Sequence, residues 1–538
     1  MACHRDSNNV IHGPEDLYPP PDVTLGKFIS QILPLHEDRV ALVDAETEDY
    51  ITYDELYSKS LGLASYLRAQ GVQPGDAISI CSENSIHFYI PVLASFYLGA
   101  ICAPLNPMYT TRELNHTFNI SKPKFVFCSE KALKRVDEVA RHQNYVQGIV
   151  VFGRGLNHKH IPFSSTLVDK SNTIEPMDGD PTDLVAVILC SSGTTGLPKG
   201  VMLTHANILR VMSLIIDPRF NDIKPDGPPP TIASFLPFFH AMAFISHLLT
   251  VTFGAKCIIL KKFSEELLLK TVEKYKVTVM PLVPAVAVLL SKSDNVKKYD
   301  LSSLQMIQSG GSLLHKETAL QMQNKVGVEM VRQGYGLTET TLGVLLNSPT
   351  NYRIGPVGQL VPAMLCKVVD VETGKNLGPN ERGELCFKGP LIMKGYCNDP
   401  KATADMMDSE GFLHTGDIGY YDEELYFYVV DRMKELIKYK GYQVPPAELE
   451  DVLLTHPAVL DAGVTSIPDE SAGELPVAFI VKQTGKQVTK QEIIKYVEER
   501  VSPEKRLRGG VIFIDAIPRT PSGKILRRQL KNLTKSKL

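Results

Sequence analysis

Neither sign of charge is in clear excess in this chain of 538 residues, because 57 lysines and arginines stand against 60 aspartates and glutamates, a net charge of −3. The sequence therefore gives no electrostatic reason to expect nucleic acid or an anionic membrane as its main partner. It also contains no internal repeat and no low-complexity tract. With 43% hydrophobic and 22% charged residues, it predicts a folded globular protein rather than a disordered one.

Paired cysteines are missing as well. The nine cysteines are dispersed and no two form a Cys-x-x-Cys pair, which indicates reduced intracellular thiols and excludes a disulfide framework or an ordinary zinc site. The N-terminus lacks the apolar core of a signal peptide. The longest uncharged stretch, roughly residues 88–108, is interrupted by prolines. We expect a buried helix and then a strand there, with a membrane span as the alternative.

The length of the chain exceeds that of one compact core and predicts more than one domain. After a polar, proline-rich arm at 1–24, helical and strand patterns alternate, which favours an α/β fold of layered, parallel sheets. Thr52 and Glu55, for example, form the pattern of a capping box that opens a helix running to Gln70. The next strand is expected at 77–81.

The pattern changes near residue 430. Before this point, short strands rich in turns predict a short-strand barrel beside the layered sheets. After it, the chain reads as a small α+β unit, with elements expected at 446–454, 459–467, 477–482 and 490–501. We therefore expect a large N-terminal domain over 1–430 and a small C-terminal domain over 431–538, with a hinge at 431–434.

The segment with the most distinctive chemistry follows the continuous apolar run 184–190, which is expected to be a buried strand. Its glycines let the backbone approach a ligand closely, its hydroxyls donate hydrogen bonds, and its lysine supplies charge, a composition suited to a polyphosphate. The glycine spacing is not that of the ordinary P-loop, and a Ser/Gly surface loop is the alternative. The segment reads Ser191, Ser192, Gly193, Thr194, Thr195, Gly196, Leu197, Pro198, Lys199 and Gly200.

This loop resembles the phosphate-binding signature of the adenylate-forming superfamily, which includes acyl-CoA synthetases, 4-coumarate–CoA ligases and beetle luciferases. Four further segments resemble the superfamily's other motifs in the same order and, with the loop, cover nearly the whole chain. They are the adenine and metal motif at 333–339, the ribose motif at 414–417, the hinge at 431–441 and the lysine loop at 521–524.

The resemblance implies an ATP-dependent enzyme that activates a carboxylate as an acyl-adenylate. A carboxylate cannot acylate a thiol directly, whereas its attack on the α-phosphate of ATP gives a mixed anhydride and expels pyrophosphate. Thr338 and Glu339 are then expected to hold the α-phosphate and Mg²⁺, and Lys524 to bridge the carboxylate and the α-phosphate. The expected adenine and ribose contacts are Gln333, Gly334, Tyr335 and Gly336, with Asp417 and Arg432.

Taken one at a time, these residues have ordinary structural alternatives. Asp417 could cap a turn, Arg432 could be a solvated linker charge, and Lys524 could belong to a basic C-terminal surface. The resemblance also implies a mobile C-terminal domain that pivots at Lys434 and brings coenzyme A to the adenylate. The implied residues of the coenzyme A route are Lys438, Lys440 and Gly441.

The acid pocket is expected around His240, which resembles the superfamily histidine that orients the carboxylate; a core histidine is the alternative. Its neighbours are aromatic and apolar, which favours an acid with a hydrophobic body. The expected pocket residues are Phe239, Phe244, Gly310, Gly311, Ser312 and Leu342. The other histidine cluster, 158–160, is expected to be a solvated turn.

Two positions differ from the beetle luciferases that the chain resembles. Val211 stands where those enzymes have an arginine, and Leu342 where they have a serine, and an apolar wall suits an alkyl chain better. We therefore interpret the chain as a ligase for medium- to long-chain fatty acids that uses ATP, Mg²⁺ and coenzyme A. The alternatives are a luciferase-like luciferin monooxygenase, a 4-coumarate-type ligase for aromatic acids and a non-catalytic sensor of AMP or acyl-CoA.

The final three residues, Ser536, Lys537 and Leu538, form a peroxisomal import address. The sequence thus predicts a peroxisomal protein and an import receptor as its partner, with a chance ending of a lysine-rich tail as the alternative.

Overall fold

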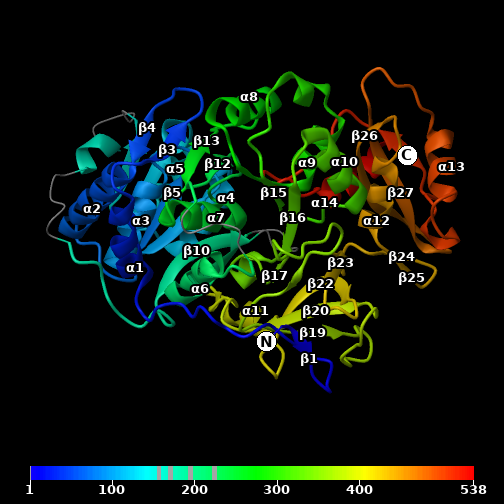
Figure 1. Ribbon diagram of the computed structural model, residues 1–538, viewed down its shortest axis with the longest axis horizontal. Helices are drawn as coiled ribbons and strands as arrows, with labels where there is room; N and C mark the ends of the chain where they lie inside the picture. The colour runs from blue at the N-terminus through cyan, green and yellow to red at the C-terminus, as the bar shows by residue number, and fades with distance from the viewer. Residues whose placement is uncertain (1, 154–158, 168–173, 192–197, 221–226, 538) are drawn as a thin grey trace.

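The computed structural model describes residues 2–153, 159–167, 174–191, 198–220 and 227–537, with side chains up to Thr534 (Figure 1). It is an α/β structure in which three sheets form the large N-terminal region and a fourth forms the C-terminal unit. The fold class predicted from the sequence is confirmed.

The first sheet is built on parallel strands. They are short and apolar, and the central ones are buried, as expected when helices cover both faces. Its order is β21 (Gly395–Tyr396), β11 (Lys199–Thr204), β10 (Val185–Ser191), β6 (Ile101–Leu105), β5 (Ala77–Cys81), β7 (Phe125–Ser129), β8 (Gly148–Phe152) and β9 (Ile161–Pro162).

The second sheet has nine strands, and its parallel core from β16 to β3 carries the acid side of the site described below. Its order is β18 (Gln359–Leu360), β17 (Leu345–Leu346), β16 (Met330–Tyr335), β15 (Met306–Ser309), β14 (Val279–Leu282), β12 (Thr231–Ser234), β13 (Lys256–Ile259), β3 (Val40–Asp44) and β4 (Tyr50–Thr52).

The helices of the large region pack on these two sheets. The helix expected after Thr52 is α2, and the capping box between Thr52 and Glu55 is present. The uncharged stretch after residue 87 forms the buried α3 and then β6, as expected. The helices are α1 (Leu25–Ile32), α2 (Tyr53–Ala69), α3 (Tyr89–Leu98), α4 (Thr111–Ser121), α5 (Glu130–Ala140), α6 (His205–Ile216), α7 (Ala241–Thr252), α8 (Glu265–Tyr275), α9 (Pro284–Lys292), α10 (Lys316–Val326) and α11 (Pro400–Ala404).

The short strands expected as a barrel form a six-stranded antiparallel sheet at the bottom of Figure 1. Part of the N-terminal arm joins it, because β2 pairs with β19. The arm is therefore a hairpin on a sheet edge as well as an extended segment. The order is β1 (His4–Arg5), β2 (Ile11–His12), β19 (Leu365–Val369), β20 (Gly383–Lys388), β22 (Leu413–Tyr421) and β23 (Phe427–Arg432).

The C-terminal unit, orange to red in Figure 1, has its own sheet and its own hydrophobic core. The change from the six-stranded sheet to this sheet falls between Arg432 and Ile437. The unit comprises β25 (Tyr442–Val444), β24 (Ile437–Tyr439), β27 (Gly473–Lys482), β26 (Val459–Asp469) and β28 (Val511–Phe513), with α12 (Pro446–Leu454), α13 (Lys490–Glu498) and α14 (Arg527–Lys537).

Three further predictions can be compared with the structure. All nine cysteines lie in the described part of the chain and are free thiols, as expected. None of the helices described is both long and apolar enough to cross a membrane. The expectation of a solvated turn at 158–160 is wrong for His160, which is buried with its Nε2 atom 3.3 Å from Asp137 Oδ1. His158 lies outside the described residues.

Candidate active site

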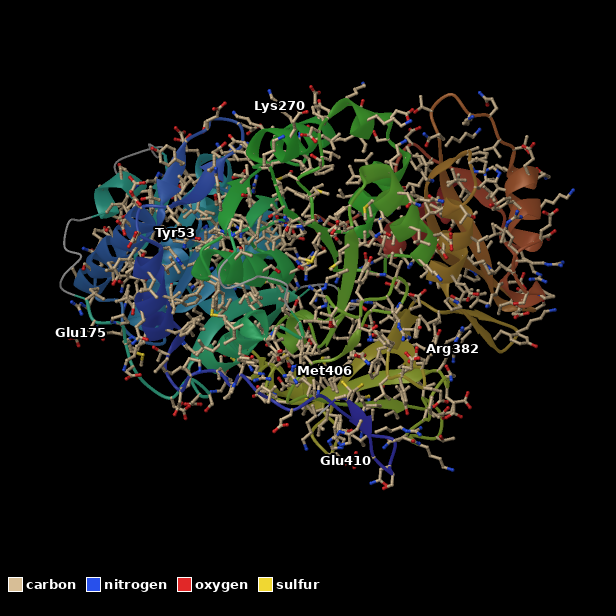
Figure 2. The ribbon with its side chains drawn as sticks, viewed as in Figure 1. Tyr53, Glu175, Lys270, Arg382, Met406 and Glu410 are labelled. Carbon is tan, nitrogen blue, oxygen red and sulfur yellow. The ribbon has the colours of Figure 1, made fainter. Side chains whose placement is uncertain are left out.

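A cavity of about 1040 Å³ opens between the large N-terminal region and the C-terminal unit. Its lining includes described residues from each segment that resembles a superfamily motif, but not the expected coenzyme A residues Lys438, Lys440 and Gly441. Figure 2 labels Met406, one of the lining residues, near the boundary between the layered sheets and the six-stranded sheet. The residues predicted to contact the nucleotide or the metal that line the cavity, with the predicted lysine, are Ser191, Lys199, Gly334, Tyr335, Gly336, Thr338, Glu339, Asp417, Arg432 and Lys524.

The expected ribose end of the cavity is built on neighbouring strands. Asp417 on β22 pairs in register with Arg432 on β23, and Arg432 Nε lies 3.5 Å from Asp417 Oδ1. The Tyr335 hydroxyl donates a hydrogen bond of 2.7 Å to Asp417 Oδ2. Burial raises the pKa of Asp417, and the positive charge of Arg432 opposes this rise. The arrangement leaves a buried acceptor carboxyl facing the cavity between a phenol and a guanidinium.

A side chain missed from the sequence positions this aspartate. Glu384 on β20 accepts a hydrogen bond of 2.8 Å from the Gly416 backbone N–H, and its other oxygen lies 2.7 Å from His414 Nδ1. Gly416 has a φ of +70°, a left-handed conformation that suits glycine. The potential ligand atoms of Glu384, Cys386 and His414 lie within 4.8 Å of one another. Because both Glu384 oxygens already accept hydrogen bonds, we interpret the group as a brace for the turn before Asp417.

The expected phosphate end contains Lys199 and Glu339. Ser191 and Lys199 face each other as the last pair of the β10–β11 hairpin. The part of the predicted loop from Ser192 to Leu197 lies outside the described residues. Glu339 is 9% exposed and accepts a hydrogen bond of 2.8 Å from the Tyr396 hydroxyl. The Lys199 ammonium lies 4.7 Å from the centre of the Tyr396 ring, so this tyrosine, also missed from the sequence, holds both charged groups.

Lys524 reaches the cavity from the C-terminal unit. It ends a tight turn in which Thr520 N–H donates to the Lys524 carbonyl at 2.8 Å and Lys524 N–H donates to Thr520 Oγ1 at 3.1 Å. Arg519 braces the same turn, since it donates to the Gly523 carbonyl at 2.9 Å and to Asp461 Oδ1 at 2.8 Å. Burial and then the charge of Arg432 lower the pKa of Lys524.

His240 is the N-cap residue of α7 and lines the cavity together with Lys524. Burial, and then the positive charge of Lys524, lower the pKa of His240 to about 4. The imidazole is therefore neutral near pH 7. A neutral histidine can donate one hydrogen bond to a carboxylate without adding a full charge.

The acid side of the cavity lies between α6, α7 and the second sheet and is lined mainly by apolar side chains, with Ser246, Thr250, Gln308 and Arg332 as polar exceptions. Among the predicted pocket residues, Phe239, Gly310, Gly311 and Leu342 line it. Val211, singled out in the sequence as a position that differs from the luciferases, also lines it. Further lining residues, which the sequence did not single out as pocket walls, come from both helices and from the starts of several strands. They are Leu214, Ile215, Phe220, Pro230, Ile232, Met242, Leu249, Val279 and Met306.

Three sequence predictions in this region need correction. Phe244 is completely buried in the core, where its ring stacks on Tyr89 with the centroids 5.9 Å apart. Ser312 is exposed, although the two glycines before it line the cavity. Gln333 is 5% exposed and accepts a hydrogen bond from Leu314 N–H at 3.2 Å, so it supports the wall from behind. A resemblance identifies a whole segment and does not say which of its side chains point into the cavity.

The predicted coenzyme A residues Lys438, Lys440 and Gly441 lie on the exposed β24–β25 hairpin. Lys440 and Gly441 form its turn, with φ values of +46° and +84°. In this arrangement the C-terminal unit presents Lys524 to the cavity and keeps the hairpin at the surface. Lys434, the expected pivot, does line the cavity.

The assembled groups suit one type of chemistry. The site has a buried carboxyl where a ribose is expected, lysines at both ends of the expected phosphate site, and a neutral histidine beside an apolar chamber. These are the features needed to activate an acid on a nucleotide. The fold and site thus define an adenylate-forming enzyme.

The chain belongs to the family of AMP-binding enzymes. Residues 33–397 match the "AMP-binding enzyme" domain, and residues 448–524 match the "AMP-binding enzyme C-terminal domain". These matches confirm the resemblance found in the sequence.

The relatives of the chain include both luciferases and acid–CoA ligases. The chain is 41% identical to a luciferin 4-monooxygenase of Nipponoluciola cruciata, with 99% of each chain covered. It is 37% identical to the peroxisomal OPC-8:0-CoA ligase 1 of Arabidopsis thaliana, with 99% of this chain and 97% of the relative covered. The structure of ATP-bound MatB from Rhodopseudomonas palustris is similar with a TM-score of 0.85 and 27% identity, covering 95% of this chain and 99% of MatB. The chain is therefore an enzyme of the acid–CoA ligase and luciferase family.

Proposed function

We propose that the protein activates a medium- to long-chain fatty acid as its acyl-adenylate and transfers the acyl group to coenzyme A, releasing AMP and pyrophosphate. The observation that carries this proposal is the apolar chamber beside His240. It has the shape and chemistry expected of a site for an alkyl chain.

The chamber follows the second sheet from the carboxyl ends of its strands to their starts. A Cβ atom at Gly310, just after β15, would come within 3.1 Å of Met242, two residues after His240, whereas Met306 begins β15 and Val279 begins β14. Gly310 is four positions after Met306, so the chamber extends for ~13 Å along a strand. That depth suits an extended alkyl tail with its carboxylate at His240.

The chemistry assigned to each group follows from its place. A carboxylate oxygen attacks the α-phosphorus of ATP, and the bond to the β-phosphate breaks as pyrophosphate leaves. Lys524 neutralises charge that builds between the carboxylate and the α-phosphate, while Lys199 does so at the leaving phosphates. The thiol sulfur of coenzyme A then attacks the acyl carbon, its proton is lost, and AMP departs with the bridging oxygen.

Magnesium fits the expected phosphate end. Glu339 and Thr338 supply the oxygen ligands that Mg²⁺ prefers, and the Tyr396 hydroxyl fixes the Glu339 carboxylate. Mg²⁺ would supply charge neutralisation on the phosphates. The Lys199 ammonium lies over the ring of the same tyrosine, 4.7 Å from its centre.

The second candidate is a luciferase-like monooxygenase, which the 41% identity to a luciferin 4-monooxygenase favours. Val211 and Leu342 both line the acid chamber, so their apolar side chains shape the wall that meets the acid. Apolar walls at both positions favour an alkyl tail over a polar heteroaromatic ring. A flat aromatic acid such as 4-coumarate would leave the deep end of the chamber unfilled.

A larger side chain at Val279 tests the proposal. Val279→Phe should fill the chamber beyond the middle of its length and move the preferred acid from dodecanoate toward hexanoate, by about 10-fold in the ratio of kcat/KM values. Val371→Phe, at a side chain that is 44% exposed, is the matched control and should keep the wild-type profile. The measurement is acyl-CoA formation with acids of six to sixteen carbons, 4-coumarate and luciferin. A wild-type preference for either aromatic acid would refute the fatty-acid assignment.

We also propose a peroxisomal location, which the Ser536-Lys537-Leu538 ending and the peroxisomal name of the Arabidopsis relative support. Removing these three residues should leave the acyl-CoA synthesis rate unchanged and abolish import. Import of the shortened chain at the normal level would contradict the proposal.

A further inference from the structure

The face of α9 that meets the C-terminal unit carries a lysine that belongs to neither half of the reaction described above. In Figure 1, α9 and α10 lie beside α12 and β26. The Lys292 ammonium, at the end of α9, donates a hydrogen bond of 3.2 Å to the carbonyl of Leu454 and another to the carbonyl of Val459. Leu454 is the last residue of α12 and Val459 the first of β26. A cation thus caps the C-terminus of a helix across the boundary between the two domains.

Two further contacts lie on the same face. A Cβ atom at Gly523, next to Lys524, would come within 2.8 Å of Val283 Cγ2, and Val283 is the N-cap residue of α9. His315, the N-cap residue of α10, has its Nδ1 atom 3.5 Å from Asp451 Oδ1 on α12. The start of α9 therefore lies against the lysine turn, and its end holds α12 and β26.

The hydrogen bonds of Lys292 are connected to Lys524 through a short chain of contacts. Val459 begins β26, and Asp461 two residues later accepts the hydrogen bond from Arg519. Arg519 donates in turn to the carbonyl of Gly523, the residue before Lys524. A shift of the start of β26 would therefore move the turn that presents Lys524 to the cavity.

We propose that Lys292 is a positioning residue for adenylate formation, which docks α12 and β26 on α9 and so places Lys524 at the α-phosphate. This inference rests on the proposed acid activation but not on the identity of the acid. Its physical basis is that a reacting group displaced by 1 Å can cost about 10²-fold in rate. Transfer to coenzyme A, for which Lys524 must withdraw, does not need this contact.

The charges around Lys292 are consistent with a docking role. Burial lowers the pKa of Lys292 to about 8, and the carboxyl group of Asp461 opposes the decrease. The ammonium of Lys292 in turn contributes, after burial and Arg500, to the low pKa of His456, which follows α12. Asp461 is already paired with Arg519, so the main acceptors of Lys292 are the two carbonyls.

The test separates the two half-reactions in the full-length protein. Lys292→Met should lower kcat for dodecanoate-dependent ATP–pyrophosphate exchange about 10-fold or more, with the KM for ATP little changed, because the large region supplies the rest of the ATP site. Transfer of the acyl group from synthetic dodecanoyl-adenylate to coenzyme A should stay within about twofold of wild type. Lys292→Arg should restore part of the exchange rate, because a guanidinium can also donate to two carbonyls. Lys297→Met, at an exposed lysine just beyond α9, should match wild type in both assays.

Two results would overturn the inference: an unchanged exchange rate in Lys292→Met, or an equal loss in both half-reactions. The second would mean that Lys292 only stabilises the fold. The fatty-acid proposal can fail separately. If wild-type protein exchanges pyrophosphate with 4-coumarate or luciferin but not with dodecanoate, the same variants are compared with the acid that is accepted and its adenylate.

Discussion

At the residue scale, Lys524 is the side chain that connects the C-terminal unit to the expected chemistry. It lines the same cavity as His240 and Asp417. Its positive charge lowers the pKa of His240 and also opposes the rise that burial causes in the pKa of Asp417. Its own pKa is lowered by burial, yet the nearby carboxyls of Asp417 and Glu339 favour its charged form. Such a lysine is placed to stabilise charge that develops on an oxygen between them.

Lys524→Ala should slow adenylate formation by roughly 10²- to 10³-fold, the usual effect of losing one transition-state donor. Thioester formation from preformed acyl-adenylate should be largely spared, because the lysine has no part in attack by the thiol. Exchange of pyrophosphate and transfer from synthetic adenylate measure the two steps. Equal losses in both would be inconsistent with the role assigned to Lys524.

At the scale of single elements, α7 carries two histidines with different surroundings. His240 caps its start at the cavity, whereas His247 is 4% exposed, with Tyr89 and Phe238 packed against it. Burial lowers the pKa of His247 to about 3. The unfolded chain, with an ordinary histidine pKa near 6.5, binds a proton at a higher pH than the folded chain does. Stability should therefore decrease as the pH falls below about 6.5.

Between pH 6.5 and 5, His247 alone should reduce the free energy of unfolding by about 1.5 kcal/mol. The measurement is the melting temperature by calorimetry at both pH values, for wild type and for His247→Gln. The variant should lose less on acidification, and the comparison isolates this residue because the other titrating groups are shared. Equal shifts in the two proteins would contradict a neutral, buried His247.

The sequence predicted elements best where local signals are strong. The capping box at Thr52, the helix at Pro446–Leu454 and the buried strand before the phosphate loop all follow from residue types at fixed spacings. Motif residues were likewise placed in the cavity from sequence. Glu384 and Tyr396 were missed because each acts on a partner distant in sequence, Gly416 or Glu339. Phe244 was misplaced because the face of α7 that meets the chamber depends on how the helix packs.

At the scale of the whole molecule, the site is completed only when two domains meet. The large region supplies the ribose end, Lys199 and the acid chamber, and the C-terminal unit supplies Lys524. The contacts of α9 with α12 and β26 hold the unit in the arrangement that suits adenylate formation. The exposed β24–β25 hairpin, with Lys438 and Lys440, must approach the cavity by a different arrangement if it is to guide coenzyme A.

The most direct test of the account is release of AMP by purified wild-type protein, with ATP and Mg²⁺, measured with and without coenzyme A for fatty acids, 4-coumarate and luciferin. We predict acid-dependent AMP release that is highest for medium- to long-chain fatty acids and requires coenzyme A for repeated turnover, with one acyl-CoA formed for each AMP. If none of these acids leads to AMP release, or if luciferin gives the fastest release independently of coenzyme A, the assignment as a fatty-acyl-CoA ligase is wrong.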